Sequence, residues 1–268
     1  MKVTVDYMSD LHIDFHARQI NNTIKWKKNT LDVLQQCVNQ SKIQSRILVL
    51  AGDISHWNLQ TKWVLEYFAE LYDKVLMTYG NHDLYLVSKT QENKYKRDSF
   101  KRLFEIIDFA ENHDKICLLS RNHPIKITTE WGSKISVFGD FMYYPLNSTT
   151  AQNFYKNVSN DSSFVLLESF EKEYEKSKLA YENWLQNESR QAEYSLFIPH
   201  VPPIWTPSHS RYQPECYLAP VDELPPNTIF GHTHENFVKD IGGIQWATNT
   251  WGYDEIGTIK TLELIPNE

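Results

Sequence analysis

Five short motifs along the chain carry groups that can bind metal ions. They are Asp10-Leu11-His12, Gly52-Asp53, Gly80-Asn81-His82-Asp83, His200 and Gly231-His232-Thr233-His234. Carboxylate and amide oxygens suit hard cations, and neutral imidazoles suit manganese, iron and zinc. Hydrolysis with two metal ions needs such donors around both ions, with one carboxylate shared between them. The sequence therefore predicts a two-metal site. Its candidate ligands are Asp10, His12, Asp53, Asn81, His200, His232 and His234.

The spacing within the motifs favours convergence on one site. Asp10 and His12 are two residues apart, so an extended segment would point both side chains to the same side. His232 and His234 repeat this spacing. His82 follows Asn81 and is a candidate for proton transfer, because histidine titrates near neutral pH. Each motif alone is weak evidence, since such residues also occur in ordinary turns.

A short strand is predicted immediately before each motif. The five strands run from Val3 to Tyr7, Arg46 to Leu50, Lys74 to Thr78, Ser195 to Pro199 and Thr228 to Phe230. Helical spacing from Leu31 to Gln40 and from Trp63 to Leu71 separates the first three. Alternating strands and helices favour an α/β fold, in which ligands gather at the carboxyl ends of the strands.

The remaining segments indicate more strands and one insertion. A helix is predicted from Phe100 to Phe109, and strands are predicted at Lys115 to Leu119, Ile125 to Thr129, Lys134 to Phe138 and Ile244 to Ala247. A polar loop after Phe141 leads into a long helical stretch from about Ser163 to Glu188. We predict a single domain over residues 1–268, with a mostly helical insertion at about 141–194.

Composition and charge limit the classes of partner. The formal net charge of the 268-residue chain is -7, so tight binding to duplex DNA is not expected. Bound cations would reverse the local charge and leave an anionic phosphate substrate plausible. Cys37, Cys117 and Cys216 lack CxxC spacing, which indicates a reducing compartment. With no signal sequence and no long apolar stretch, we expect a cytoplasmic protein without a membrane span.

The ordered motifs DxH, GDxx, GNHD, a later His and GHxH resemble those of the calcineurin-like metallophosphoesterase superfamily. They extend from Asp10 to His234, and the context around Gly231 and from Asn249 to Tyr253 resembles a bacterial and phage branch of that superfamily. The resemblance implies a four-layer α/β sandwich of two mixed β-sheets flanked by helices. It also implies that the protein is an enzyme that hydrolyses phosphoesters.

The resemblance also implies roles for individual residues. Asp10, His12, Asp53 and His234 would hold one metal ion, and Asp53, Asn81, His200 and His232 would hold the other. The two ions would be divalent or trivalent, with manganese expected and iron or zinc as alternatives. A metal-bridging hydroxide would attack phosphorus in line. His82 would protonate the leaving oxygen, and Asp83 would orient the His82 imidazole.

The substrate is less constrained by the sequence. We expect a phosphodiesterase acting on a nucleotide or another small phosphorylated molecule, with His56, Tyr143 and Tyr253 as candidate substrate contacts. Aromatic side chains beside the motifs could stack on a base or sugar, although they more often serve packing. The stretch from Gly52 to Trp57 lacks the Asp-Arg-Gly of protein Ser/Thr phosphatases, which argues against a phosphoprotein substrate.

Two alternatives stay open at this point. The first is a nuclease for single-stranded ends, in which aromatic stacking would matter more than net charge. The second is a metal-binding interaction protein without activity. Loss of a ligand would favour the second alternative, but all seven candidate ligands and His82 are present.

Overall fold

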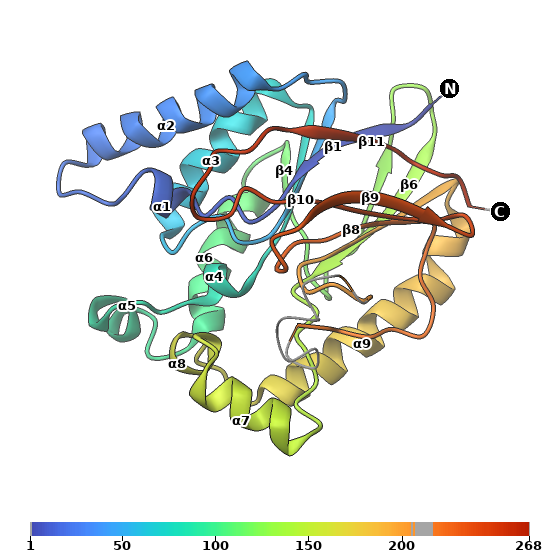
Figure 1. Ribbon diagram of the computed structural model, residues 1–268. Coiled ribbons are helices and arrows are strands. Elements are labelled where there is room, and N and C mark those ends of the chain that lie inside the picture. Colours follow the sequence, from blue (N-terminus) through green and yellow to red (C-terminus); the bar gives the residue numbers. More distant parts are fainter. Residues whose placement is uncertain (1, 205, 207–216, 268) are drawn as a thin grey trace.

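Two β-sheets pack face to face at the centre of the molecule (Figure 1). The computed structural model describes residues 2–204, 206 and 217–267. The first sheet has the order β11 (Lys260–Glu263), β1 (Thr4–Met8), β2 (Ile47–Ala51), β3 (Lys74–Thr78) and β4 (Ile116–Leu118). The second has the order β5 (Ile125–Thr128), β6 (Lys134–Asp140), β7 (Tyr194–Pro199), β8 (Asn227–Ile229), β10 (Ile244–Asn249) and β9 (Asn236–Ile241). Both sheets are mixed, because antiparallel edge strands flank parallel central strands.

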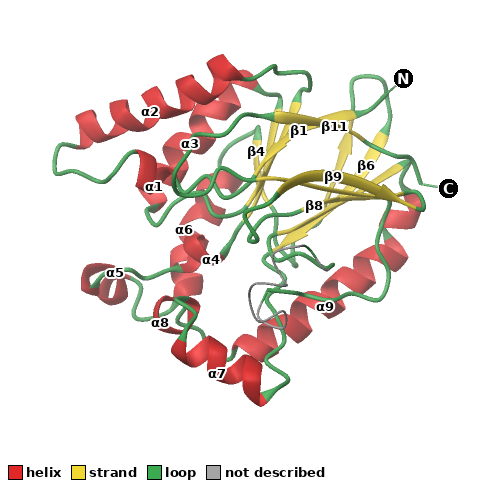
Figure 2. Ribbon diagram, in the orientation of Figure 1, coloured by secondary structure: helices red, strands yellow, loops and turns green. Residues whose placement is uncertain are grey.

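Helices cover the outer faces of both sheets (Figure 2). The first sheet is covered by α2 (Thr23–Gln40), α3 (Asn58–Leu71) and α6 (Ser99–Glu111), and the second by α9 (Phe170–Asn187). On α9, Trp184 donates a hydrogen bond from Nε1 to Ser136 Oγ of β6 at 2.8 Å. The shorter elements are α1 (Ile13–His16), α4 (Asn81–Leu84), α5 (Lys89–Lys94), α7 (Thr149–Asn157), α8 (Asp161–Phe164) and the 3-10 turn η1 (Ser189–Gln191). This arrangement confirms the expected sandwich of two mixed sheets between helices.

The sequence of strand β2 is apolar throughout because both of its faces are buried. Ile47, Val49 and Ala51 belong to the core between the two sheets, whereas Leu48 and Leu50 pack in the core on the helical side. A strand that is buried on both faces reads as a continuous apolar run. The strand is therefore held rigidly up to Ala51, immediately before Gly52 and Asp53.

The predicted strands agree with the observed ones to within two residues at either end. Two strands were not predicted, β9 and β11. Helix α2 starts earlier than predicted, at Thr23, because the side chain of Asn22 caps it by accepting a hydrogen bond from the Lys25 N–H at 3.0 Å.

The long helix predicted from about Ser163 to Glu188 is interrupted. Helix α8 ends at Phe164, and α9 begins at Phe170 after its cap residue Ser169, whose hydroxyl accepts a hydrogen bond from Lys172 N. Between them the chain pairs with Ser99, whose backbone N–H donates to Leu166 O at 3.0 Å. A capping serine and an outside backbone partner thus replace a continuous helix. The preceding loop also contains a helix that was not predicted, α7.

Each of the five motifs follows a strand, as predicted. Asp10 follows β1, Asp53 follows β2, Asn81 follows β3, His200 follows β7 and His232 follows β8. These carboxyl ends meet at one edge of the sandwich, where the candidate site lies.

Two further findings concern the cysteines and the helices. Cys37 is buried in α2 and Cys117 is half-buried in β4, and both are free thiols. Cys216 lies outside the described residues. Within the described part of the chain, no helix combines the length and apolarity needed to cross a bilayer.

Candidate metal centre

The seven candidate ligands converge from both sheets. His12 Nε2 lies 3.1 Å from His234 Nε2, and His234 Nε2 lies 3.5 Å from Asp10 Oδ1. On the other side of the site, His200 Nε2 lies 3.1 Å from Asn81 Oδ1. The His232 ring is 5.1 Å from that of His200, centroid to centroid. The structure therefore brings all seven side chains together.

Asp53 lies between the two halves of this cluster. Its Oδ2 atom is 3.8 Å from His12 Nε2 and 3.5 Å from His200 Nε2. Asp10, His12 and His234 have ligand atoms within 4.8 Å of one another, as do Asp10, Asp53 and His200. A third such group joins His12 and Asp53 to His82. One carboxylate oxygen of Asp53 thus lies near imidazoles of both halves of the cluster.

Five of the seven candidate ligands have left-handed backbone conformations. The φ angles are 49° at Asp10, 41° at His12, 57° at Asp53, 68° at His232 and 51° at His234. The prediction that Asp10 to His12 is extended is therefore wrong. Positive φ is uncommon for residues other than glycine and is concentrated at functional sites, where the surrounding structure must hold it. Here backbone bonds do so, from Asp10 N to Gly52 O and from His12 N to Asp53 O, both at 3.0 Å.

Glycine at position 80 permits the close approach of the strand ends. A Cβ atom at Gly80 would overlap Asp53 Oδ1 and would lie 2.7 Å from His200 Nε2. A side chain at position 80 would therefore displace either the Asp53 carboxylate or the His200 imidazole. The glycine of the GNHD motif is explained by this contact.

The electrostatics of the cluster suit cations. Burial disfavours the charged form of Asp53, but the imidazoles of His200 and His82 outweigh it and lower the pKa of Asp53 well below its ordinary value. Burial lowers the pKa of His12 to about 4, so its ring is neutral at pH 7, as a metal ligand must be. Burial also opposes charge on His200, yet Asp53 raises its pKa to about 9. A bound cation would take the place of that proton, so the donor set fits metal ions.

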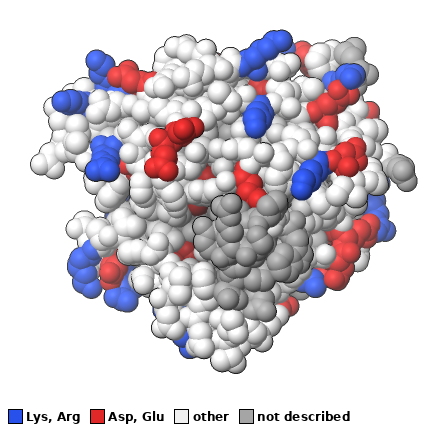
Figure 3. Space-filling model, in the orientation of Figure 1, with Lys and Arg blue, Asp and Glu red and all other residues white. Residues whose placement is uncertain are grey.

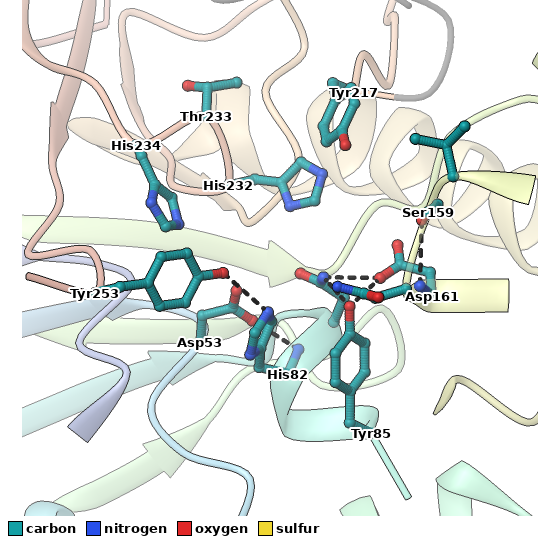
Figure 4. Close-up of a pocket in the computed structure, with 13 residues that line it drawn as sticks. Asp53, His82, Tyr85, Ser159, Asp161, Tyr217, His232, Thr233, His234 and Tyr253 are labelled. Atoms are coloured by element: carbon teal, nitrogen blue, oxygen red, sulfur yellow. Dashed lines mark hydrogen bonds between the residues drawn. The ribbon is translucent and has the colours of Figure 1, made fainter. Parts of the chain in front are cut away.

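His82 is held by groups on either side of its ring, and Figure 4 shows one of them, Tyr253. His82 Nδ1 lies 2.7 Å from His56 Nε2, and His56 Nδ1 lies 2.7 Å from Asp14 Oδ2. On the side of the site, His82 Nε2 lies 3.3 Å from the Tyr253 hydroxyl. The backbone N–H of His82 donates to Asp53 Oδ1 at 2.8 Å. The ring is therefore fixed beside the Asp53 carboxylate with Nε2 toward the site.

The carboxylate of Asp83, which was predicted to act on the His82 imidazole, binds backbone N–H groups. Its Oδ2 accepts hydrogen bonds from Asp53 N and Gly80 N, both at 2.9 Å, and its Oδ1 accepts one from Ile54 N at 3.2 Å. Among the described residues, no hydrogen bond joins Asp83 to the His82 imidazole, which His56 holds instead. Asp83 fastens the loop after β2 to the loop after β3. The sequence could not distinguish these roles, because both place an acidic residue beside His82.

We expect Asp83→Asn to lower the free energy of unfolding by about 2 to 4 kcal/mol. Both carboxylate oxygens face N–H donors. An asparagine must turn its NH₂ group toward one of these donors, whichever way the amide is oriented. Two donors would then face each other, and at least one backbone N–H would lose its hydrogen bond. Urea denaturation of the metal-free protein measures the change. Asp108→Asn, the same change on the exposed face of α6, is the control. Equal stability of the two variants would contradict this role of Asp83.

The predicted substrate contacts have different surroundings. Tyr143 is fully buried against Phe141 and Phe170, with ring centroids 4.6 and 5.2 Å away, so it packs in the core and does not reach the site. Both ring nitrogens of His56 have partners within the protein, so its contact with substrate is not supported either. Tyr253 is 42% exposed and lines the pocket, and its contact with substrate stays a prediction.

A pocket of about 250 Å³ opens over the cluster (Figure 4). Asp53, Asn81 and His82 form its floor, and Tyr253 and the His232 to His234 turn form one side. Another side is formed by Val158, Ser159 and Asn160, which lie between α7 and α8, and by Asp161, the first residue of α8. Sequence reasoning missed Asp14 and Asp161, since neither lies in a motif. Their contacts with His56 and Asn81 depend on tertiary structure alone.

Comparisons with known proteins extend these observations. A family model described as calcineurin-like phosphoesterase matches residues 3–236. A search of curated protein sequences finds no match. Among solved structures, phosphopantetheinyl hydrolase from Mycobacterium tuberculosis is similar, with a TM-score of 0.69, 16% sequence identity and coverage of 97% of this chain and 96% of that chain. A putative 5'-nucleotidase from Staphylococcus aureus has a TM-score of 0.46 and 12% identity, covering 100% of this chain and 53% of that chain. At 16% identity, the similarity to phosphopantetheinyl hydrolase shows that the two chains share a fold.

Proposed function

The chain belongs to the calcineurin-like phosphoesterase family of metal-dependent hydrolases, and from this premise we propose that it is a phosphodiesterase for a nucleotide or another small phosphorylated molecule. The observation that carries the proposal is the position of Asp53 Oδ2 between His12 Nε2 and His200 Nε2. A single carboxylate there can serve two cations at once.

Under this proposal, the ligands divide into two sets that share Asp53. One ion would be held by Asp10, His12, Asp53 and His234, and the other by Asp53, Asn81, His200 and His232. We expect manganese, with iron or zinc as alternatives, because the donors are carboxylates, an amide oxygen and imidazoles. When bound, the two ions would supply an activated hydroxide and neutralise the phosphate oxygens.

The chain itself would supply the proton for the leaving oxygen. His82 directs Nε2 to the site and is backed by His56, which is in turn fixed by Asp14. A general acid needs a fixed position within hydrogen-bond reach of the atom that it protonates. We assign that role to His82 and give His56 and Asp14 the task of holding its ring.

The lining of the pocket favours a diester over a monoester. Among the described residues that line it there is neither Lys nor Arg, while Asp161 adds a second carboxylate to that of Asp53. A phosphomonoester carries close to two negative charges at pH 7, whereas a diester carries one. If the metal ions are the main source of positive charge beside this described lining, the less anionic substrate fits better.

Hydrolysis of two reporter esters tests the proposal. Metal-stripped protein is re-supplied with Mn²⁺ and assayed with bis-p-nitrophenyl phosphate and with p-nitrophenyl phosphate. We expect activity only with metal and a higher kcat/KM for the diester. A higher value for the monoester would reject the diesterase assignment but not the chemistry. Absence of hydrolysis with any divalent cation, despite two bound ions, would favour a binding protein without activity.

A nuclease for single strands is the second candidate, because an exposed aromatic pair lies beside the site. Phe15 and Tyr253 are 41% and 42% exposed, and their ring centroids are 4.8 Å apart. Such rings can stack on bases. However, on the face shown in Figure 3 the basic side chains are scattered among acidic ones. Cleavage of a short single-stranded oligonucleotide at a higher kcat/KM than the small diester would favour the nuclease.

A further inference from the structure

The side-chain amide of Asn81 is held by groups outside the sequence motifs. Its Nδ2 donates hydrogen bonds to Asp161 Oδ1 at 2.8 Å and to the Tyr85 hydroxyl at 3.1 Å. Its Oδ1 lies on the opposite side, 3.1 Å from His200 Nε2. The two ends of an amide are almost alike in shape, so hydrogen-bond partners decide which end faces a given position. Here the partners direct the oxygen toward the proposed metal position.

Asp161 is itself fixed by three donors. Besides Asn81, the Tyr85 hydroxyl donates to its Oδ1 at 2.6 Å (Figure 4). The Tyr144 hydroxyl donates to its Oδ2 at 2.7 Å. The residue is 3% exposed. Because the Tyr85 proton is directed to Asp161, the Tyr85 oxygen is left to accept from Asn81. Asn81, Tyr85, Tyr144 and Asp161 thus form one hydrogen-bond network. In this network the Asn81 amide has one favourable orientation, with its NH₂ group toward Asp161 and Tyr85.

The segment that carries Asp161 is tied to the elements around Asn81. The backbone N–H of Leu86 donates to Phe164 O at 2.9 Å, and that of Leu166 donates to Ser99 Oγ at 2.9 Å. Helix α8 is therefore anchored at its far end to the loop after α4 and to the start of α6. This anchoring fixes Asp161 relative to β3, which positions Asn81.

We propose that Asp161 is a positioning residue for the metal ion held by Asn81, His200, His232 and Asp53. It acts by keeping the amide oxygen of Asn81 turned toward that ion, and so makes one of the two metal positions depend on the segment between α7 and α9. The inference rests on the proposed ligand assignment. Partners that orient metal ligands typically change metal affinity by about 10- to 100-fold.

Titration of the metal-free protein with Mn²⁺ tests this role without an activity assay. Calorimetry gives the affinity of each ion, and electron paramagnetic resonance distinguishes a coupled Mn²⁺ pair from an isolated ion. For Asp161→Ala we expect one ion to bind as in the wild type and the other about 10- to 100-fold more weakly. The coupled signal should give way to that of an isolated ion at intermediate metal concentrations.

Two further variants separate positioning from a general effect. Glu168→Gln removes a negative charge from the same segment at an exposed side chain, and it should bind both ions like the wild type. Tyr85→Phe removes the other acceptor of the Asn81 amide and should weaken the same ion by a smaller factor. Should Asp161→Ala fail to fold, as judged by circular dichroism, Tyr85→Phe and Asp161→Asn decide the question by the same titration.

Wild-type affinity for both ions in the folded Asp161 and Tyr85 variants would overturn the inference. Equal weakening of both ions would also overturn it, because the effect would then not be specific to the ion at Asn81. A wild-type protein that binds no pair of ions would instead refute the proposed function, so the two failures are distinguishable.

Discussion

Asp53→Asn is expected to lower kcat for bis-p-nitrophenyl phosphate by about a thousandfold or more, which corresponds to about 4 kcal/mol. Asp53 Oδ2 lies 3.8 Å from His12 Nε2 and 3.5 Å from His200 Nε2, so it faces both imidazoles together. An amide is neutral and binds cations more weakly than a carboxylate. The variant should also lose the coupled pair of Mn²⁺ ions.

The asparagine variant is a conservative test of this role. Asp53 Oδ1 accepts the His82 N–H at 2.8 Å, and the amide oxygen of asparagine can keep that bond. The fold should therefore persist, which circular dichroism can check. Asp108→Asn serves again as the exposed control and should retain full activity. A folded Asp53→Asn enzyme that bound two ions and kept a tenth of the wild-type kcat would refute the shared-ligand assignment.

His82→Ala is expected to affect substrates according to their leaving groups. With a diester of a poor, alkoxide leaving group, kcat should fall by about 10²- to 10⁴-fold, the usual contribution of a general acid. With a p-nitrophenyl ester the fall should be much smaller, because p-nitrophenolate departs readily without a proton. Steady-state kinetics with both esters measures the difference.

The neighbour of His82 provides a matched comparison. His56→Ala removes the group that holds His82 Nδ1 but leaves His82 itself in place, so it should show the same dependence on leaving group with a smaller loss. In the double variant, the two losses should not add, since both act through one imidazole. Equal losses with good and poor leaving groups would indicate a structural role for His82 and reject its assignment as the acid.

Much of this site could be predicted because the signals are local. Ile47 to Ala51 is apolar on both faces and stops at Gly52-Asp53, so the sequence shows both the strand and its end. The same holds for β3 before Gly80 and for β7 before His200. Strand β9 lacks such a signal, since its residues are mostly exposed and mixed in character, and it is held by pairing with β10.

The errors arise where tertiary contacts decide. Tyr143 lies just past the end of β6, but its ring packs in a core formed with Phe170 of α9. Asp14 and Asp161 reach the site through the fold, without any pattern in their own neighbourhood. The left-handed conformation of Asp10 and His12 is imposed by backbone contacts with the loop after β2, which a single segment does not reveal.

The candidate ligands are divided between the two sheets. Asp10, Asp53 and Asn81 follow strands of the first sheet, and His200 and His232 follow strands of the second. Any ion held by both sets would join the sheets as a cross-link does. Because a ligand that binds only the folded chain stabilises it, each tenfold rise in free metal above the dissociation constant would add about 1.4 kcal/mol per ion. The cations would then stabilise the packing of the two sheets as well as take part in the reaction.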